Sequence, residues 1–201
     1  TLLYTTRVQG CPGCGGFYDD VKRKKTGASH GTLAQAMEKA GSAKRISTGV
    51  GEFDKVLGGD LASGWGLVPG STVIVTGPPS MGKTTLLLQA ADHIVASKKV
   101  LYASGEMAAG DVGLFGQRMG CKNAEKIVLL GNEGDVYKIV EEAEEMSAKM
   151  LVVDSAQTAY VSDVGGDEGS MEQVRATANL LTALGKRTGC VVLLVSHVNK
   201  F

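Results

Sequence analysis

The chain has 201 residues and a mass of 20.9 kDa, about the size of one domain, and 43% of its residues are hydrophobic and 21% charged. This composition excludes a disordered tail, and no apolar run approaches the roughly 18 residues of a membrane span. The net charge is zero, but residues 1–45 carry +5 and residues 46–201 carry −5. The main body is therefore not the broadly basic surface that nucleic acids favour, and any contact with nucleic acid would be local.

The basic N-terminal arm, residues 1–45, contains Cys11 and Cys14 in a Cys-x-x-Cys-Gly turn. Two cysteines at this spacing are typical of half a zinc site, and structural zinc takes four protein ligands. His30 is a candidate third ligand and no fourth is evident nearby. An intact zinc site, a degenerate one and a ligand donated by a neighbouring copy therefore stay open as alternatives. The arm also predicts one short helix near residues 32–40.

The number of cysteines and the first residues bear on whether the protein is secreted. Four cysteines, scattered over the chain, do not form the dense framework of a small secreted scaffold. Thr1 to Gln9 lack the basic start and the apolar stretch of a secretory signal. We therefore expect a cytoplasmic protein with no membrane partner.

From residue 46 to residue 201, short apolar runs alternate with helical stretches, which predicts an α/β domain with a mostly parallel sheet flanked by helices. The predicted strands are Thr72–Thr76, Val100–Ser104, Ile127–Leu130, Met150–Asp154 and Val191–Ser196. The predicted helices are Lys83–Ala96, Asp111–Met119, Asp135–Ala148 and Met171–Arg187. Ligands of such domains bind beyond the carboxyl ends of the strands, where polar residues do follow the runs.

A phosphate-binding loop follows the first predicted strand. It fits the pattern G-x-x-x-x-G-K-[ST] without a mismatch and is formed by Gly77, Pro78, Pro79, Ser80, Met81, Gly82, Lys83 and Thr84, with Thr85 next on the helix. Backbone N–H groups of such a loop and the start of the helix bind a polyanion. We expect Lys83 to reach the β- and γ-phosphates of ATP and the Thr84 hydroxyl to bind Mg²⁺.

Three further polar residues end or follow strands. Asp154 closes an apolar strand and is a second candidate ligand of Mg²⁺, although many strands end in an Asp that only forms a turn. Glu106 is a candidate for orienting or deprotonating a water molecule, with a solvated turn acid as the alternative. His197 ends the last strand, where it could contact the γ-phosphate, but a lone His there is more often structural.

Several strings resemble the RecA-like P-loop ATPase core, and most closely the bacterial RadA/Sms family of DNA-repair ATPases. They include Arg45-Ile-Ser-Thr-Gly49, Leu101-Tyr-Ala-Ser-Gly-Glu106, Asp154-Ser-Ala-Gln-Thr158 and His197-Val-Asn-Lys200, and the likeness spans about residues 45–200. The resemblance implies that Glu106 activates water and that His197 senses the γ-phosphate. It also implies a ring or filament of identical subunits that hold ATP between them.

The same resemblance implies single-stranded DNA as the partner. It makes Val161–Ser170 a candidate mobile loop facing the DNA, although this loop is acidic, and it places Gln173 and Arg175 near that surface. An ordinary solvated helix face is the alternative for these two residues.

The chain also departs from the family pattern. The second cysteine pair of the family's zinc finger is missing, and Asp60–Gly66 reads as an insertion. The chain stops at Phe201, before the family's later strands and its Lys-Asn-Arg-Phe-Gly motif, so it reads as a C-terminally truncated core. An Arg or Lys finger supplied across a subunit boundary is then expected to be missing.

The sequence therefore predicts a Mg-ATP-dependent ATPase that acts on single-stranded DNA in recombination, repair or replication, by branch migration or helicase-like movement. The alternative is a nucleotide-dependent assembly or DNA-binding module with little hydrolysis. A small-molecule kinase is a third reading, but the chain has no recognisable lid for a phosphate acceptor.

Overall fold

The computed structural model describes residues 31–35 and 44–197, and the chain divides into two units, Thr1–Gly41 and Ser42–Phe201. In the first unit, residues 33–35 are helical. The backbone N–H of Thr32 donates to Gln35 Oε1 at 3.0 Å, and that of Gln35 donates to Thr32 Oγ1 at 3.3 Å. This reciprocal pair is the start of the helix expected near residues 32–40. The candidate zinc ligands Cys11, Cys14 and His30 lie outside the described residues.

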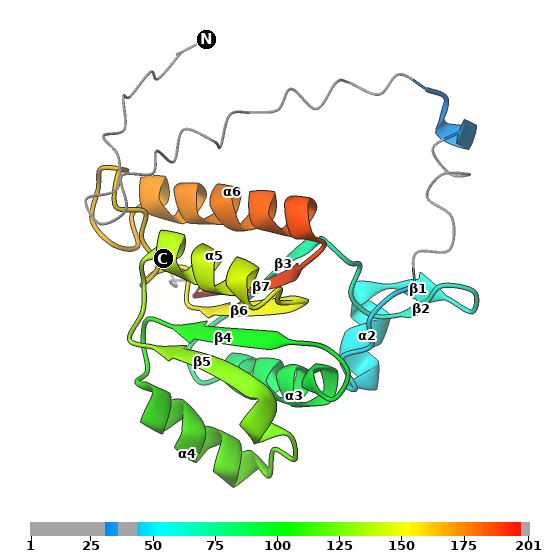
Figure 1. Cartoon of the computed structure of the whole chain (residues 1–201), viewed down its shortest axis with the longest axis horizontal. Helices are drawn as coiled ribbons and strands as arrows, with labels where there is room; N and C mark the ends of the chain where they lie inside the picture. Colours follow the sequence, from blue (N-terminus) through cyan, green and yellow to red (C-terminus); the bar gives the residue numbers. More distant parts are fainter. Residues whose placement is uncertain (1–30, 36–43, 198–201) are drawn as a thin grey trace. The chain divides into compact units, whose positions relative to one another are not determined.

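The second unit is built on a parallel sheet of five strands in the order β3-β7-β6-β4-β5, which confirms the predicted α/β class (Figure 1). The strands are β3 (Thr72–Gly77), β4 (Val100–Ser104), β5 (Ile127–Gly131), β6 (Met150–Asp154) and β7 (Val191–His197). Each predicted strand starts at its observed first residue and ends within one residue of its observed end. Because all strands run the same way, their carboxyl ends meet along one edge of the sheet.

Helices cover both faces of this sheet, α5 and α6 on one face and α3 and α4 on the other (Figure 1). They are α3 (Lys83–Val95), α4 (Ala109–Met119), α5 (Val136–Glu145) and α6 (Met171–Thr188), with a single 3₁₀ turn, η2 (Ala124–Lys126), before β5. None of the helices in the described part of the chain combines the length and the apolar character that crossing a membrane requires.

The alternation of side chains along each strand divides the core in two. In β4, Leu101 and Ala103 pack in the cluster beneath α5 and α6, whereas Val100 and Tyr102 pack in the cluster around α3. Successive residues of a strand point to opposite faces, and both faces of β4 and β6 are buried. This is why these strands read as continuous apolar runs instead of alternating ones.

Local signals set the starts and ends of the helices on the α5–α6 face. The Ser170 hydroxyl accepts from the Gln173 N–H at the start of α6, and the Asp135 carboxylate accepts from the Tyr137 N–H at 3.0 Å at the start of α5. Helix α6 ends at Thr188, and Gly189 at its C-cap has a φ of 73°, a left-handed conformation that suits glycine.

Before the sheet, the chain forms a helix that the sequence did not predict, α2 (Gly51–Leu57), and a small antiparallel hairpin of β1 (Gly59–Asp60) and β2 (Gly64–Trp65). The hairpin occupies the stretch that reads as an insertion. The buried Asp54 of α2 accepts hydrogen bonds from Ser47 Oγ at 2.6 Å and from the Thr48 backbone at 2.8 Å. This carboxylate fixes the lead-in to the sheet.

Candidate nucleotide site

The phosphate loop lies at the carboxyl end of β3, between that strand and α3, as the motif predicts. Gly82, at the N-cap of α3, has a φ of 81°, a left-handed conformation that favours glycine. Lys83 is 9% exposed, and its Nζ donates to the carbonyl oxygens of Gly77 and Pro78, both at 2.8 Å. The ammonium group is therefore held against the loop, where a bound phosphate would meet it.

The outer part of the loop is open to solvent. Pro79, Ser80 and Met81 are exposed, and the side chain of Met81 is 71% accessible. Thr85 is half-buried in the first turn of α3. The loop thus combines one buried cation at its base with exposed backbone at its tip.

Thr84 and Asp154, which lie 70 positions apart in the chain, are in direct contact. The Thr84 hydroxyl donates to Asp154 Oδ2 at 2.9 Å, and the Asp154 side chain is buried at the end of β6. Tyr102 on the neighbouring β4 also donates its hydroxyl to Asp154 Oδ2 at 2.9 Å. Burial, together with the nearby Asp154 carboxylate, raises the pKa of Tyr102 well above its usual range, so this hydroxyl stays a donor.

The chemistry of this pair fits Mg²⁺. The ion takes oxygen ligands and is usually held by one or two protein groups, with waters and substrate phosphates completing its shell. The Thr84 hydroxyl and the Asp154 carboxylate supply two such oxygens beside the phosphate loop. Within residues 31–35 and 44–197, no group of three or more His, Cys, Asp and Glu side chains is placed to hold a metal ion.

Glu106 and His197 also meet at this edge. His197 Nε2 lies 3.2 Å from Glu106 Oε1, and the Ser155 hydroxyl donates to the same carboxylate oxygen. Glu106 follows β4, Ser155 follows β6 and His197 ends β7, so three neighbouring strands deliver this cluster. The sequence singled out Glu106 and His197, but not Ser155 and not the contact between them.

Gln157 ties the loop after β6 to the end of β7. Its Nε2 donates to Ser196 Oγ at 3.1 Å and to the His197 carbonyl oxygen at 3.2 Å. Gln157 Oε1 and His197 Nδ1 are buried and have no hydrogen-bond partner among the described residues. Buried polar atoms are rarely left unpaired, so this edge has spare hydrogen-bonding capacity for a ligand or water.

Gln173 lies buried against the loop Val161–Ser170, so the alternative of a solvated helix face is wrong for this residue. Gln173 is 3% exposed, and its side-chain amide forms hydrogen bonds with the backbone of the preceding loop. Its Oε1 accepts from the Val161 N–H at 2.8 Å, and its Nε2 donates to the carbonyl oxygens of Val161 and Val164 at 3.3 and 2.6 Å. The helix phase turns Gln173 inward, whereas Arg175 is exposed.

Two comparisons place the sequence among known proteins. The model of the AAA domain family (AAA_25) matches residues 61–201. DNA repair protein RadA of Mycobacterium tuberculosis is 34% identical over 96% of this chain and 42% of its own length. The RadA of Bacillus subtilis is 36% identical over 94% of this chain and 43% of its own, and that of Escherichia coli 39% over 78% and 32%. The chain thus spans less than half the length of these relatives.

The fold has a counterpart among solved structures. The crystal structure of a KaiC-like protein from Pyrococcus horikoshii OT3 superposes with a TM-score of 0.59 over 78% of this chain and 71% of that chain. The two sequences are 20% identical, so this likeness supports the arrangement of the sheet and helices.

Proposed function

This chain belongs to the AAA domain family and is a RecA-like P-loop ATPase core similar to RadA, and from that premise we propose that it binds Mg-ATP and hydrolyses it in concert with single-stranded DNA. RadA relatives carry the name of a DNA repair protein, which supports a role in DNA repair. The substrate, the reaction and the DNA partner of this chain are our proposals.

One observation carries the nucleotide part of the proposal: three groups of side chains distant in sequence meet at the carboxyl edge of the sheet. Lys83 lies against the phosphate loop, Thr84 contacts Asp154, and Glu106 contacts His197. Phosphoryl transfer to water requires positioning and charge neutralisation and little covalent chemistry from the protein. A cation, a pair of metal ligands and a carboxylate near one loop meet that requirement.

Each residue then has a defined task. Lys83 exchanges its loop carbonyls for phosphate oxygens when the nucleotide binds. Thr84 and Asp154 hold Mg²⁺, which neutralises charge on the phosphate oxygens. Glu106 orients the attacking water and accepts its proton, while His197, whose Nε2 lies 3.2 Å from Glu106 Oε1, contacts the γ-phosphate. Gly77, Pro78, Pro79, Ser80, Met81, Gly82 and Thr85 complete the cradle.

We propose that single-stranded DNA contacts the exposed segment after β6. Residues 165–169 are exposed and lie between the active-site edge and α6, and Arg175 is exposed on α6. We place the DNA along Val161–Ser170 and Arg175, and we expect several copies to assemble with ATP between neighbours. The buried Gln173 supports this segment from beneath and is not part of the contact.

The test is steady-state hydrolysis of ATP by the 201-residue chain, with and without single-stranded DNA, together with its mass in solution with ATP. Lys83→Ala is the variant, and Lys122→Ala, which removes an exposed lysine outside the loop, is the matched control. We expect Lys83→Ala to abolish binding of ATP and turnover, and the control to behave as the original chain does.

The possible outcomes separate the proposal from its alternative. ATP hydrolysis that single-stranded DNA stimulates supports the proposed DNA-dependent ATPase. ATP binding and ATP-dependent assembly without turnover would favour the module that uses nucleotide only to assemble. Unchanged hydrolysis in Lys83→Ala would overturn the assignment of the loop.

A further inference from the structure

Three lysines stand side by side at the opposite edge of the sheet, where the strands begin. Lys126, Lys99 and Lys149 immediately precede β5, β4 and β6. The parallel register pairs Val100 with both Ile127 and Met150, so the residue before each strand falls in the same row. Neighbouring strands are about 4.8 Å apart, so the backbones of these three lysines span about 10 Å. We refer to Lys99, Lys126 and Lys149 as the lysine row.

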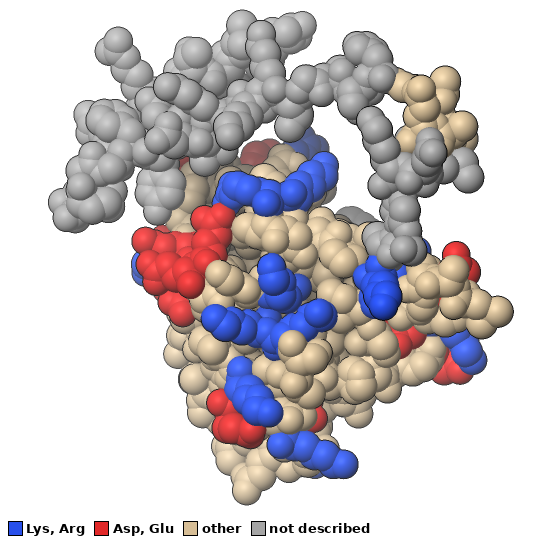
Figure 2. Space-filling model, turned by 45° about the vertical axis from the view of Figure 1, so that its right-hand side comes forward, with Lys and Arg blue, Asp and Glu red and all other residues tan. Residues whose placement is uncertain are grey.

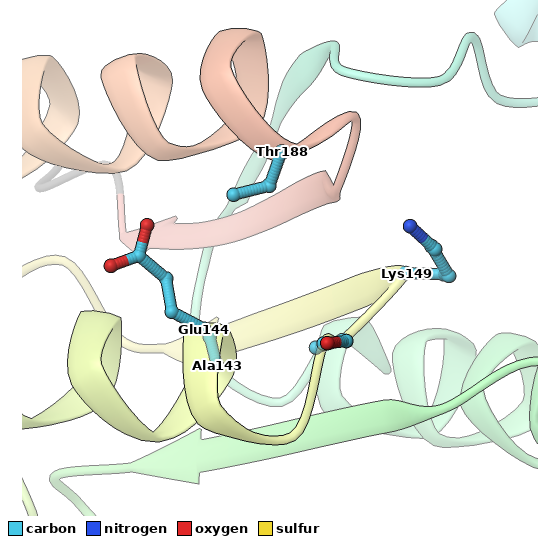
Figure 3. Close-up of a pocket in the computed structure, with 6 residues that line it drawn as sticks. Ala143, Glu144, Lys149 and Thr188 are labelled. Carbon is cyan, nitrogen blue, oxygen red and sulfur yellow. The ribbon is translucent and has the colours of Figure 1, made fainter.

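All three side chains of the lysine row are exposed, and none forms an ion pair with a residue of the described ranges. Glu144, which lines a pocket together with Lys149, is engaged elsewhere, because it accepts from Arg187 Nε at 2.9 Å. Glu144 and Lys149 both line a pocket of about 280 Å³, but Figure 3 shows them on opposite sides of it. Within the described residues, no ion pair therefore neutralises the positive charge of the row.

A second hollow lies along the row. It has a volume of about 310 Å³ and is lined by Lys98, Lys99 and Lys126, together with Val95 and Ser97. Figure 2 shows Lys and Arg side chains gathered on the face that this view brings forward, with Asp and Glu mostly toward its margins and one acidic group beside the lower basic side chains. Residues 46–201 are acidic as a whole but carry a local basic surface at the edge farthest along the strands from the phosphate loop.

We propose that the lysine row binds the phosphate backbone of a single strand of nucleic acid. One strand carries a negative charge for about every 3.4 Å of rise, so a row of about 10 Å faces about three consecutive phosphates. Lysine suits this task, because its ammonium is a mobile point charge on a flexible stem. The twist of the sheet turns each lysine relative to the next, and a flexible single strand can follow that path.

This inference rests on the proposed function for its choice of nucleic acid, but it uses a surface that no step of ATP hydrolysis requires. The row holds the strand outside the nucleotide site and contributes affinity without reading sequence, since phosphate contacts carry no sequence information. A strand that also contacts the segment after β6 would be bound at both edges of the sheet.

The test measures binding of an oligothymidylate of about 20 nucleotides, longer than a typical single site, as a function of salt concentration and without nucleotide. The variant is the triple replacement Lys99→Gln, Lys126→Gln and Lys149→Gln, compared with Lys99→Gln/Lys149→Gln alone. The matched control for the double variant is Lys55→Gln/Lys138→Gln, which removes the same charge from two lysines already paired with Glu52 and Glu133. ATP binding by every variant reports whether the fold and the nucleotide site are intact.

We expect the triple variant to bind at least about tenfold more weakly, and the slope of log K against log salt to fall by about 2, from roughly 0.7 per phosphate contact. The double variant should fall in between, and the control should keep the original slope. An unchanged slope in the triple variant overturns the inference while leaving the proposed function in place. No binding of oligothymidylate by the original chain, with ATP still hydrolysed, overturns both the row and the DNA partner but not the ATPase. If the triple variant binds the oligothymidylate as the original chain does and differs only in salt-dependent self-association, the row contacts a second copy of the chain, and the inference is overturned.

Discussion

Tyr102 donates its hydroxyl to Asp154 Oδ2 at 2.9 Å from the adjacent strand of the sheet. The same carboxylate oxygen accepts a hydrogen bond from the Thr84 hydroxyl. Two hydroxyl groups from different elements, β4 and α3, therefore fix one oxygen. The register pairs Tyr102 with Val152, two residues before Asp154, and the ring lies in the α3 cluster. Tyr102 is a positioning residue, because it orients the carboxylate that we propose as a ligand of Mg²⁺.

Tyr102→Phe should weaken the use of Mg²⁺ more than the binding of nucleotide. The ring stays in its packing site, but Asp154 Oδ2 loses one of two donors, and a buried carboxylate with fewer partners is less well fixed. We expect hydrolysis to need about tenfold more Mg²⁺, as second-shell losses typically cost. The measurement is the rate of ATP hydrolysis over a Mg²⁺ titration.

Tyr160→Phe is the control for that variant, since it deletes a phenol oxygen from a half-buried tyrosine outside the site. It should leave the Mg²⁺ dependence unchanged. Equal Mg²⁺ curves for Tyr102→Phe and the original chain would show that the contact is only structural.

Glu106 and His197 should behave as one unit in hydrolysis. Glu106→Gln removes the proposed base and should slow single-turnover hydrolysis by roughly 10²–10⁴-fold while ATP still binds. His197→Ala should slow it less, and because the two side chains are in contact, the double variant should be slower than Glu106→Gln by less than the factor for His197→Ala alone. His93→Ala, which removes an exposed histidine of α3, is the control. Fully additive losses would separate the two roles.

Gln173→Ala should release the loop that begins at Val161. The substitution leaves the Val161 N–H and two carbonyl oxygens without their amide partner, which costs about 1–3 kcal/mol of unfolding free energy for a buried unpaired group. Faster amide hydrogen exchange at Val161 and a lower urea midpoint measure the effect. Asn179→Ala, at an exposed position of the same helix, should change the free energy by less than about 0.5 kcal/mol. Unaltered exchange at Val161 would contradict the proposed support.

The sequence predicted the sheet well because its strands are buried on both faces. Apolar runs such as Met150–Asp154 have one explanation in an α/β chain, and their bounds match the structure to within a residue. The helix α2 was not predicted because its seven residues carry only one set of apolar residues at helical spacing, Phe53, Val56 and Leu57, which is too short to form a clear pattern. The carboxylate of Asp54 accepts from Ser47 and Thr48 and ties the helix to the preceding segment. Such a contact between side chain and backbone leaves no periodic pattern.

The sequence predicted most residues of the site but not the contacts between them. The phosphate loop, Asp154, Glu106 and His197 follow from motif and strand ends, but Tyr102 was not singled out, because it lies inside a buried strand. The burial of Gln173 was not predicted, since a helix of mixed polarity does not show which face is inward. Only the pairing of strands brings a hydroxyl of β4 to a carboxylate of β6.

The thiol of Cys190 should make stability fall in alkaline solution. Cys190 is 1% exposed just before β7, and burial raises the pKa of its thiol to about 12, while the nearby Lys149 charge lowers it slightly. In the unfolded chain the thiol ionises near its ordinary pKa of about 8.5. Between about pH 9 and 12 the native state therefore keeps a proton that the unfolded state has lost, and the free energy of unfolding falls as pH rises.

Cys190→Ala removes this contribution and should flatten the decline by up to about 1.4 kcal/mol per pH unit. Urea unfolding of both proteins between about pH 8 and 10 measures it, because below that range the two curves differ only by the constant cost of the smaller side chain. Cys121 is half-exposed, and burial followed by the Asp92 charge raises the pKa of its thiol. Cys121→Ala should act in the same direction with a smaller slope. If the free energies of unfolding of Cys190→Ala and the original chain run parallel up to pH 10, the Cys190 thiol has the same pKa in the folded and unfolded states, and the prediction is wrong.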